Sequence, residues 1–237
     1  METATYAILS RQSGLLREMR IVANNVANAA TTGYREGQLV FSEMVQDTRH
    51  GASVSMARAR IQTTSTAQGA LTQTAGPLDM AIEGDGFFMV ETPDGERLTR
   101  AGSFALSTNG DLVTPAGHLV LGPGGAPLFL PPMAATIHVG PDGTLSADGQ
   151  PMGQIGVFQP TNPAALVRED GVLFRADDGA DPILTPRVLQ GFLEGSNVNA
   201  ISQVARMVEI QRAYELGQSF LEREDDRVRN TIKALIR

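Results

Sequence analysis

The sequence predicts an α+β fold. Long N- and C-terminal helices are expected to pack as a coiled-coil-like helical domain, joined through an extended linker to a central, mostly antiparallel β domain. Apolar residues recur at helical spacing near both ends of the 237-residue chain, and short apolar runs between Asp-Gly or Asn-Gly pairs fill its middle. The expected division is 1–35 for the N-terminal helix, 36–77 for the linker, 78–190 for the β domain and 191–237 for the C-terminal helix.

The first expected helix runs from Tyr6 to Ala30, where apolar residues recur mostly at three- and four-residue steps. This spacing places them on one stripe of a helix. The stripe consists of Leu9, Leu15, Leu16, Met19, Val22, Ala23, Val26 and Ala27. Gly33 is expected to stop the helix by supplying a left-handed backbone conformation. A further helical turn or two is one interpretation of the apolar patch at 39–45.

Residues 50–77 are rich in Ser, Thr, Gln, Ala and Gly, and their apolar residues show neither helical nor strand periodicity. This pattern indicates an extended, weakly packed connector or a disordered segment. From Asp79 onward the pattern changes to β. Asp-Gly or Asn-Gly pairs, which favour the positive φ angles of tight turns, occur at 85–86, 94–95, 109–110, 142–143, 148–149, 170–171 and 178–179. Strand-like runs lie between them at 87–91, 119–121 and 154–158, and a loop is expected from Gly122 to Pro132.

The C-terminal segment carries the most regular pattern in the chain. Apolar residues return every seven positions, as Ala200, Met207, Tyr214, Leu221, Val228 and Leu235. A companion seam, polar in its middle, consists of Val204, Gln211, Gln218, Asp225 and Ile232. A sustained heptad predicts packing along a narrow line against other helices. Ser196 or Asn197 is the expected N-cap, and Gly217 is a tolerable interruption that costs about 1 kcal/mol.

Composition excludes several classes of function. A net charge of −7 argues against a nucleic-acid-binding protein, which needs a basic surface. The absence of cysteine excludes disulfides, thiolate metal sites and cysteine nucleophiles. No apolar stretch reaches the roughly 18 to 20 residues of a membrane span. The first residues lack a basic region, so we expect no cleavable signal peptide and, for a chain that leaves the cytoplasm, another route of export.

Residues with catalytic or metal-binding chemistry do not form a recognisable site. His50, His118 and His138 are scattered, and the acidic run 222–227 is expected to be the solvated face of the last helix. We therefore expect no catalytic, cofactor or metal site. Two alternatives stay open: a periplasmic enzyme acting on peptidoglycan, and a calcium-dependent binding module built on Asp-rich turns such as 177–179.

Three separated segments carry a family resemblance. The first comprises 23–28 (ANNVAN) and 31–35 (TTGYR), and the last comprises 191–199 (GFLEGSNVN) and 211–215 (QRAYE). The middle segment comprises 78–88 (LDMAIEGDGFF) and 99–104 (TRAGSF). In this order they resemble the signatures of the flagellar basal-body rod and hook family. Chain length together with 10–12 and 16–19 resembles the proximal rod members more than their close paralogues, the distal rod members.

The resemblance implies a structural subunit of the bacterial flagellar rod. Such a subunit is exported unfolded by the flagellar type III apparatus and polymerises into the torque-transmitting shaft in the periplasmic space. Its expected partners are other copies of itself, neighbouring rod proteins and the export apparatus, with no nucleic acid and no membrane insertion. Ordering of the terminal helices would be coupled to assembly.

The residues expected to pack during assembly come from both ends of the chain. At the N-terminal end they are Leu16, Met19, Val22, Ala23, Asn24, Asn25, Val26, Asn28, Gly33 and Tyr34. At the C-terminal end they are Ser196, Asn197, Val198, Val204, Met207, Gln211, Tyr214, Leu221, Val228 and Leu235. Two roles are open for the three asparagines, a local cap within the chain and hydrogen bonds between subunits. For Gly33 we expect a role in backbone geometry rather than contact.

Overall fold

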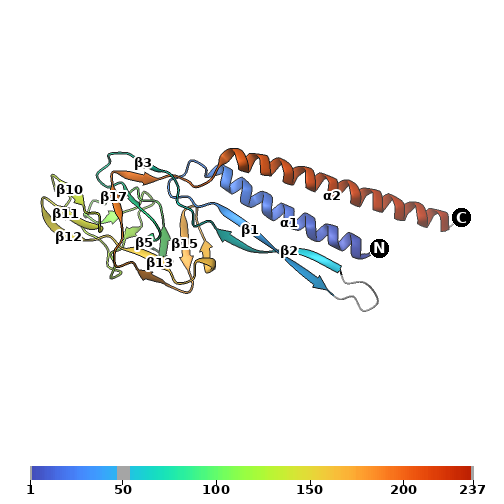
Figure 1. Ribbon diagram of the computed structural model, residues 1–237, viewed down its shortest axis with the longest axis horizontal. Helices are drawn as coiled ribbons and strands as arrows, with labels where there is room; N and C mark the ends of the chain where they lie inside the picture. The colour runs from blue at the N-terminus through green and yellow to red at the C-terminus, as the bar shows by residue number, and fades with distance from the viewer. Residues whose placement is uncertain (1, 47–53, 236–237) are drawn as a thin grey trace. The chain divides into compact units, whose positions relative to one another are not determined.

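A computed structural model of the chain describes residues 2–46 and 54–235, with side chains over 8–39 and 63–234 (Figure 1). His50 and the side chain of Leu235 lie outside the described parts. The elements are α1 (Glu2–Ala27), β1 (Gly37–Gln46), β2 (Val54–Thr64), β3 (Leu71–Gln73), β4 (Met80–Ile82), β5 (Phe87–Thr92), β6 (Gly95–Thr99), β7 (Ala105–Leu106), β8 (Leu112–Val113), β9 (Leu119–Val120), β10 (Ile137–Val139), β11 (Thr144–Ala147), β12 (Gln150–Gln154), β13 (Val157–Pro160), the short 3-10 helix η1 (Pro163–Ala165), β14 (Leu166–Arg168), β15 (Leu173–Ala176), β16 (Ala180–Pro182), β17 (Val188–Gln190), β18 (Phe192–Glu194) and α2 (Ala200–Leu235).

The chain forms two compact units. The helical unit contains α1, β1, β2 and α2, and the β unit contains residues 28–36 and 64–198. An α+β class, with one helix near each end and an antiparallel β region between them, agrees with the sequence prediction. The boundaries of the units do not coincide with the changes in composition. Residues 28–36, at the end of the first signature segment, and 191–198, in the last one, belong to the β unit.

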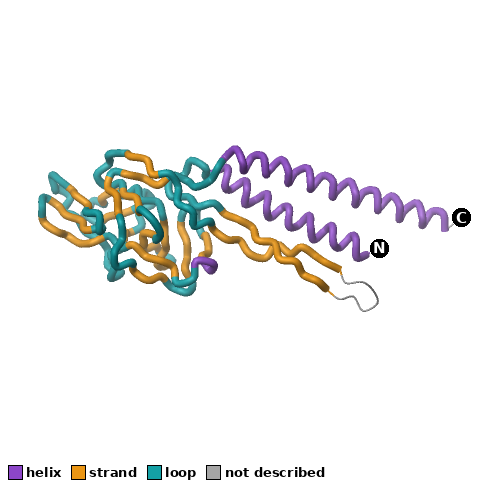
Figure 2. The backbone as a smooth tube through the Cα atoms, in the orientation of Figure 1, coloured by secondary structure: helices purple, strands orange, loops and turns teal. Residues whose placement is uncertain are grey.

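In the helical unit, α1 and α2 run antiparallel and side by side (Figures 1 and 2). The β1 strand contacts α1 and pairs with β2 in a two-stranded sheet. The interpretation of 39–45 as a helical turn was therefore wrong, and the expected connector contains a second strand. Each strand supplies the backbone partners that the other needs, and such a partner cannot be recognised from one segment alone.

The N-cap of α2 is Asn199, since its Oδ1 accepts hydrogen bonds from the backbone N–H groups of Ile201 and Ser202 at 3.1 and 3.2 Å. The expectation of Ser196 or Asn197 was wrong by two to three residues. Asn197 is used differently, because its side chain bonds backbone groups of the β unit.

The β unit is built around an antiparallel sheet with strand order β14-β15-β6-β5-β9-β8-β7, to which β13 and β16 are attached. A separate three-stranded sheet has the order β10-β11-β12. The turn prediction is confirmed: the glycine of each of the seven Asp-Gly or Asn-Gly pairs has positive φ. Several of these pairs connect adjacent strands, including 94–95 between β5 and β6 and 148–149 between β11 and β12.

Strand β5 is buried on both faces. Phe88 and Val90 belong to one hydrophobic cluster, while Phe87 and Met89 belong to a second. Successive side chains of a strand point to opposite faces, so a continuous apolar run is the sequence pattern expected of a strand covered on both sides. The β unit therefore holds two core clusters on either side of its central strand.

Candidate assembly surfaces

One face of α2 packs against α1. Its buried or half-buried residues are Gln203, Met207, Ile210, Ala213, Tyr214, Gly217, Leu221 and Glu224. The apolar seam through Met207, Tyr214 and Leu221 is thus turned toward α1. The companion seam within the chain runs through Gln203, Ile210, Gly217 and Glu224, and the expected companion residues Val204, Gln211, Gln218 and Asp225 are exposed.

The matching face of α1 is formed by Gly14, Glu18, Ile21, Val22 and Asn25, all of which are buried. Of the residues expected to pack during assembly, Met19 and Val26 are half-buried, whereas Leu16, Ala23 and Asn24 are exposed. Ile21 is absent from the predicted stripe, which contains its neighbour Val22 instead. The α1 face therefore lies one position toward the N-terminus from where the spacing placed it.

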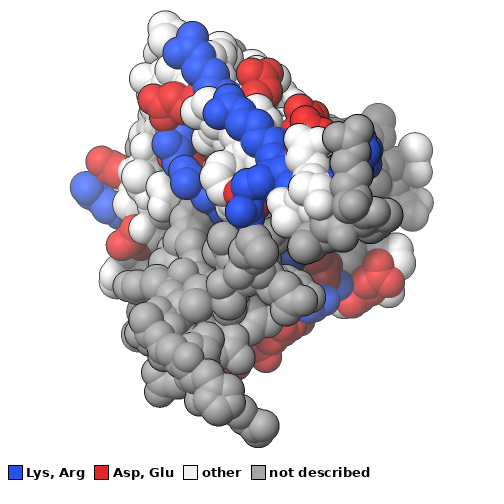
Figure 3. Space-filling view, turned by 90° about the vertical axis from the view of Figure 1, so that its right-hand side faces the viewer, with Lys and Arg blue, Asp and Glu red and all other residues white. Residues whose placement is uncertain are grey.

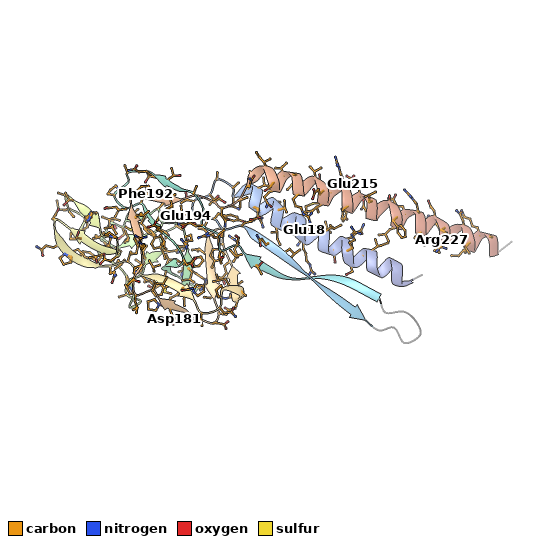
Figure 4. All side chains as sticks on the ribbon, in the orientation of Figure 1. Glu18, Asp181, Phe192, Glu194, Glu215 and Arg227 are labelled. Carbon is orange, nitrogen blue, oxygen red and sulfur yellow. The ribbon has the colours of Figure 1, made fainter. Side chains whose placement is uncertain are left out.

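An ion pair and a close approach fix the register of the two helices. Glu18 accepts hydrogen bonds from Nε and Nη2 of Arg206 at 2.8 and 2.6 Å (Figure 4). Hydrogen bonds to Glu18 and Glu209 raise the pKa of Arg206. A Cβ on Gly217 would lie 3.3 Å from Nε2 of Gln12. Gly217 therefore lies at a close helix contact and is more than an interruption of the helix.

The outer face of α2 carries apolar side chains that α1 does not cover. Ile201 is 83% exposed, and Val204 and Val208 on the same side are also exposed. Leu216 and Phe220 line a groove of about 280 Å³ beside α1. Val228 and Ile232 are exposed at the C-terminal end of α2, which has 36 residues against 26 in α1. Ile201, Val204 and Val208 recur at helical spacing on one side of α2, and a set of exposed apolar side chains on one side is typical of an interaction surface.

Charged side chains of α2 pair along the helix near its end. Arg227 bonds Glu224 at 2.8 Å and Arg229 bonds Asp225 at 2.8 Å. On the face drawn in Figure 3, basic side chains form a row with acidic side chains beside it. The acidic run 222–227 is mostly exposed, as expected of a solvated helix face.

The three signature asparagines have different environments. Asn25 is buried; its Nδ2 donates to the Gly37 carbonyl and its Oδ1 accepts from the Gly37 N–H, both at 2.9 Å. Nδ2 also donates to Oε1 of Gln203 on α2 at 3.2 Å. Asn28 accepts a bond from the Thr31 hydroxyl, a local contact just past the end of α1. Asn25 thus joins α1, β1 and α2 within one chain.

In the β unit, Glu194, which is labelled in Figure 4, lies between two buried arginines. Its Oε1 lies 3.0 Å from Nη2 of Arg35 and its Oε2 lies 2.9 Å from Nη1 of Arg100. The side chains of all three residues are at most 2% exposed. Gly69 also donates its N–H to Oε1 at 3.0 Å. This triad joins one residue from each of the three signature segments.

Burial lowers the pKa of both arginines of the triad. Burial and the nearby Arg100 guanidinium lower the pKa of Arg35 to about 10, although the Glu194 carboxylate opposes this shift. Burial also lowers the pKa of Arg100, while Glu194 opposes this change. Glu194 is the carboxylate that the two guanidinium groups share.

Asn197 and Tyr34, from the last and the first signature segments, also contact residues that are distant in the chain. Asn197 accepts from the Glu36 N–H at 2.6 Å and donates to the Ala67 carbonyl at 2.7 Å. The Tyr34 ring is buried 4.4 Å from the Arg168 guanidinium, and burial raises the pKa of its hydroxyl.

Gly33 has φ +71°, as expected, and lies six residues beyond the end of α1. A Cβ there would lie 2.2 Å from the Ala101 nitrogen, so Gly33 is also needed for contact, contrary to expectation. Ser196 accepts a bond from the Val198 N–H, and both residues are half-buried.

Among the described side chains, 8–39 and 63–234, no group of three or more His, Asp or Glu residues is arranged to hold a metal ion. His118 and His138 lie on separate strands or turns of the β unit. Among the described helices, none combines the length and apolar character needed to cross a bilayer.

Comparison with known proteins gives consistent matches along the chain. Residues 6–35 match the family model described as flagella basal body rod protein, residues 81–147 match the flagellar hook protein FlgE/F/G D1 domain, and residues 189–234 match the flagellar basal body rod FlgEFG protein C-terminal region. The flagellar basal-body rod protein FlgF of Caulobacter vibrioides is 35% identical, over 99% of this chain and 98% of the relative. FlgF of Mesorhizobium japonicum is 37% identical over 91% and 90%. FlgG of Bacillus subtilis is 30% identical over 95% and 96%.

Proposed function

This chain belongs to the flagellar basal-body rod protein family, and from that premise we propose that it is a structural subunit of the proximal rod that polymerises through its terminal helices. The greater similarity to FlgF relatives, at 32–37% identity, than to FlgG relatives, at 29–30%, supports the proximal assignment. In this role the subunit is part of the axial shaft that transmits torque, and it has no catalytic activity.

The exposed apolar face of α2 is the observation that carries the proposal. A pair of helices is marginal in water when little apolar surface is buried. Full burial of an exposed aliphatic side chain contributes roughly 1.5 to 3 kcal/mol. A neighbouring subunit would therefore gain most of this amount from Ile201, which is 83% exposed, and about half of it from each of Val204 and Val208, which are 49% and 40% exposed. The exposed Gln211 and Gln218 would find hydrogen-bond partners in the same crowded array. The seam toward α1 and this outer face together would give coiled-coil-like packing among subunits.

We further propose that the subunit reaches the periplasm through the flagellar type III apparatus, without a cleavable signal peptide. Terminal helices that gain most of their stability on assembly are compatible with export of an unfolded chain. The chain's partners are then the export apparatus first, and other copies and neighbouring rod proteins afterwards.

The test replaces apolar residues of the outer face. The variant Ile201→Asp/Val204→Asp is expected to abolish motility and to remove the chain from isolated basal bodies, because two charges cannot be buried between subunits without partners. The free chain should keep its stability, since both side chains are already exposed. Motility plates, immunoblots of basal bodies and thermal unfolding measure these effects.

Asn230→Asp is the control, because it adds a negative charge at an exposed polar position of the same helix. It should assemble normally. Normal basal bodies built from the Ile201→Asp/Val204→Asp variant would contradict assembly through this face.

A further inference from the structure

The β unit contains a groove of about 450 Å³ that the helical packing does not explain. Its walls include Pro115 and Ala116 from the turn between β8 and β9, and Val172 and Leu173 from the start of β15. Asp170 also lines the groove and is exposed. Thr and Ser hydroxyl groups and the His118 side chain also line the groove, so it combines apolar walls with polar groups and has a carboxylate at its side.

The same unit presents an apolar side chain on a separate segment. Leu184, between β16 and β17, is 92% exposed. The segment is held in place on both sides, because Ile183 donates its N–H to the Val157 carbonyl and Pro186 is buried. A side chain displayed on a fixed backbone loses little conformational freedom when it binds.

A basic residue follows close behind this side chain. Arg187 has 75% of its side chain exposed, and its ion pair with Glu83 at 3.3 Å is also exposed. Exposed ion pairs contribute little free energy, so Arg187 can exchange this partner for another carboxylate. The Leu184 segment thus combines an apolar side chain and a cation, and the groove combines apolar walls and an anion.

Charge distinguishes Leu184 from the other strongly exposed apolar side chain of the unit, Met133. The segment after Met133 bonds the carboxylate of Asp148 through the N–H groups of Ala135 and Thr136. Docking Met133 would bring an acidic group toward Asp170. Arg168, two residues before Asp170, is already engaged within its own unit, because it donates to the Gly171 carbonyl and is half-buried over the Tyr34 ring.

We infer that the groove of one copy receives Leu184 of a second copy, with Arg187 of the incoming segment paired to Asp170. None of the incoming residues lines the groove, so each copy offers two different surfaces. Contacts of this kind are heterologous and generate open helical arrays. The inference rests on the proposed function and adds a contact between β units to the helix packing.

The test uses the absence of native cysteine. In a chain carrying Leu184→Cys and Ala116→Cys, mild oxidation of isolated basal bodies should yield disulfide-linked dimers and longer ladders of this chain. Neither single cysteine variant should do so. Both positions are exposed, so folding should be unchanged, which circular dichroism of the free chain checks.

A charge exchange gives an independent readout. Asp170→Arg and Arg187→Asp should each reduce incorporation into basal bodies about fivefold, and the double variant should restore it, as expected for a coupled charge pair. Absence of a disulfide in the double cysteine variant, or a defect in the charge exchange that is not restored, would overturn the inference. If a different rod protein or a small molecule occupied the groove instead, no disulfide-linked ladder of this chain would form either.

Failure of the inference and failure of the proposed function give different results. If the chain is present in basal bodies and the Ile201→Asp/Val204→Asp variant is excluded from them, the function stands while the groove contact falls. If the unaltered chain is itself absent from basal bodies, both are overturned.

Discussion

Replacing Glu194 by glutamine is expected to lower the free energy of unfolding of the β unit by about 3–5 kcal/mol, the usual cost of breaking a buried ion pair. The substitution keeps the size of the side chain but removes its charge. Arg35 and Arg100 would then be two buried cations without their shared carboxylate, and the new amide group would place N–H donors next to guanidinium donors. Urea titration of the full chain, followed by amide exchange of peptides from the β unit, measures the change.

Glu169→Gln is a matched control. Glu169 also lies between two arginines, Arg97 and Arg175, but its side chain is 29% exposed. Solvent screens this second triad, so its loss should cost a small fraction of the effect at Glu194. Equal destabilisation by the two substitutions would show that burial of the Glu194 triad is not what makes it important.

Replacing Asn25 by alanine is the second change with a large expected effect. It removes the partner of both the N–H and the carbonyl of Gly37, and each buried backbone group left without a partner costs about 1–3 kcal/mol. The helical unit should be destabilised, and exchange of the Gly37 amide should accelerate strongly. Amide exchange resolved by NMR measures both effects.

The neighbouring substitution Asn24→Ala is the control, because Asn24 is exposed on the same helix and within the same signature. Its effect on exchange at Gly37 should be small. If the two alanine variants had the same effect, the buried position of Asn25 would not explain its role.

The turns of the β unit could be predicted from the sequence because their cause is local. An Asp-Gly or Asn-Gly pair supplies the positive φ angle of its own turn, and no distant residue is needed to recognise it. The heptad of α2 could be recognised for the same reason, since its period is a property of one segment. The side of the heptad that faces α1 could not, because Val204 and Gln203 are equally placed beside the apolar seam.

The junction of the signature segments could not be predicted because its partners are far apart in the chain. Arg35, Arg100 and Glu194 are ordinary charged residues when read singly, and only the fold brings them together. The three asparagines show the same limit: the sequence presents them as one motif, whereas only Asn25 ties α1 to β1 and α2. The β1–β2 pair was missed because pairing, not local composition, makes those segments strands.

Amide hydrogen exchange of the terminal helices, compared between the dilute free chain and isolated basal bodies, tests the central claim most directly. If assembly completes the ordering of the ends, amides of α1 and α2 should exchange faster than those of the core strand β5 in the free chain and become as strongly protected as β5 in basal bodies. Equal protection of α1 and α2 in the two samples would contradict the claim that these helices gain their stability from assembly.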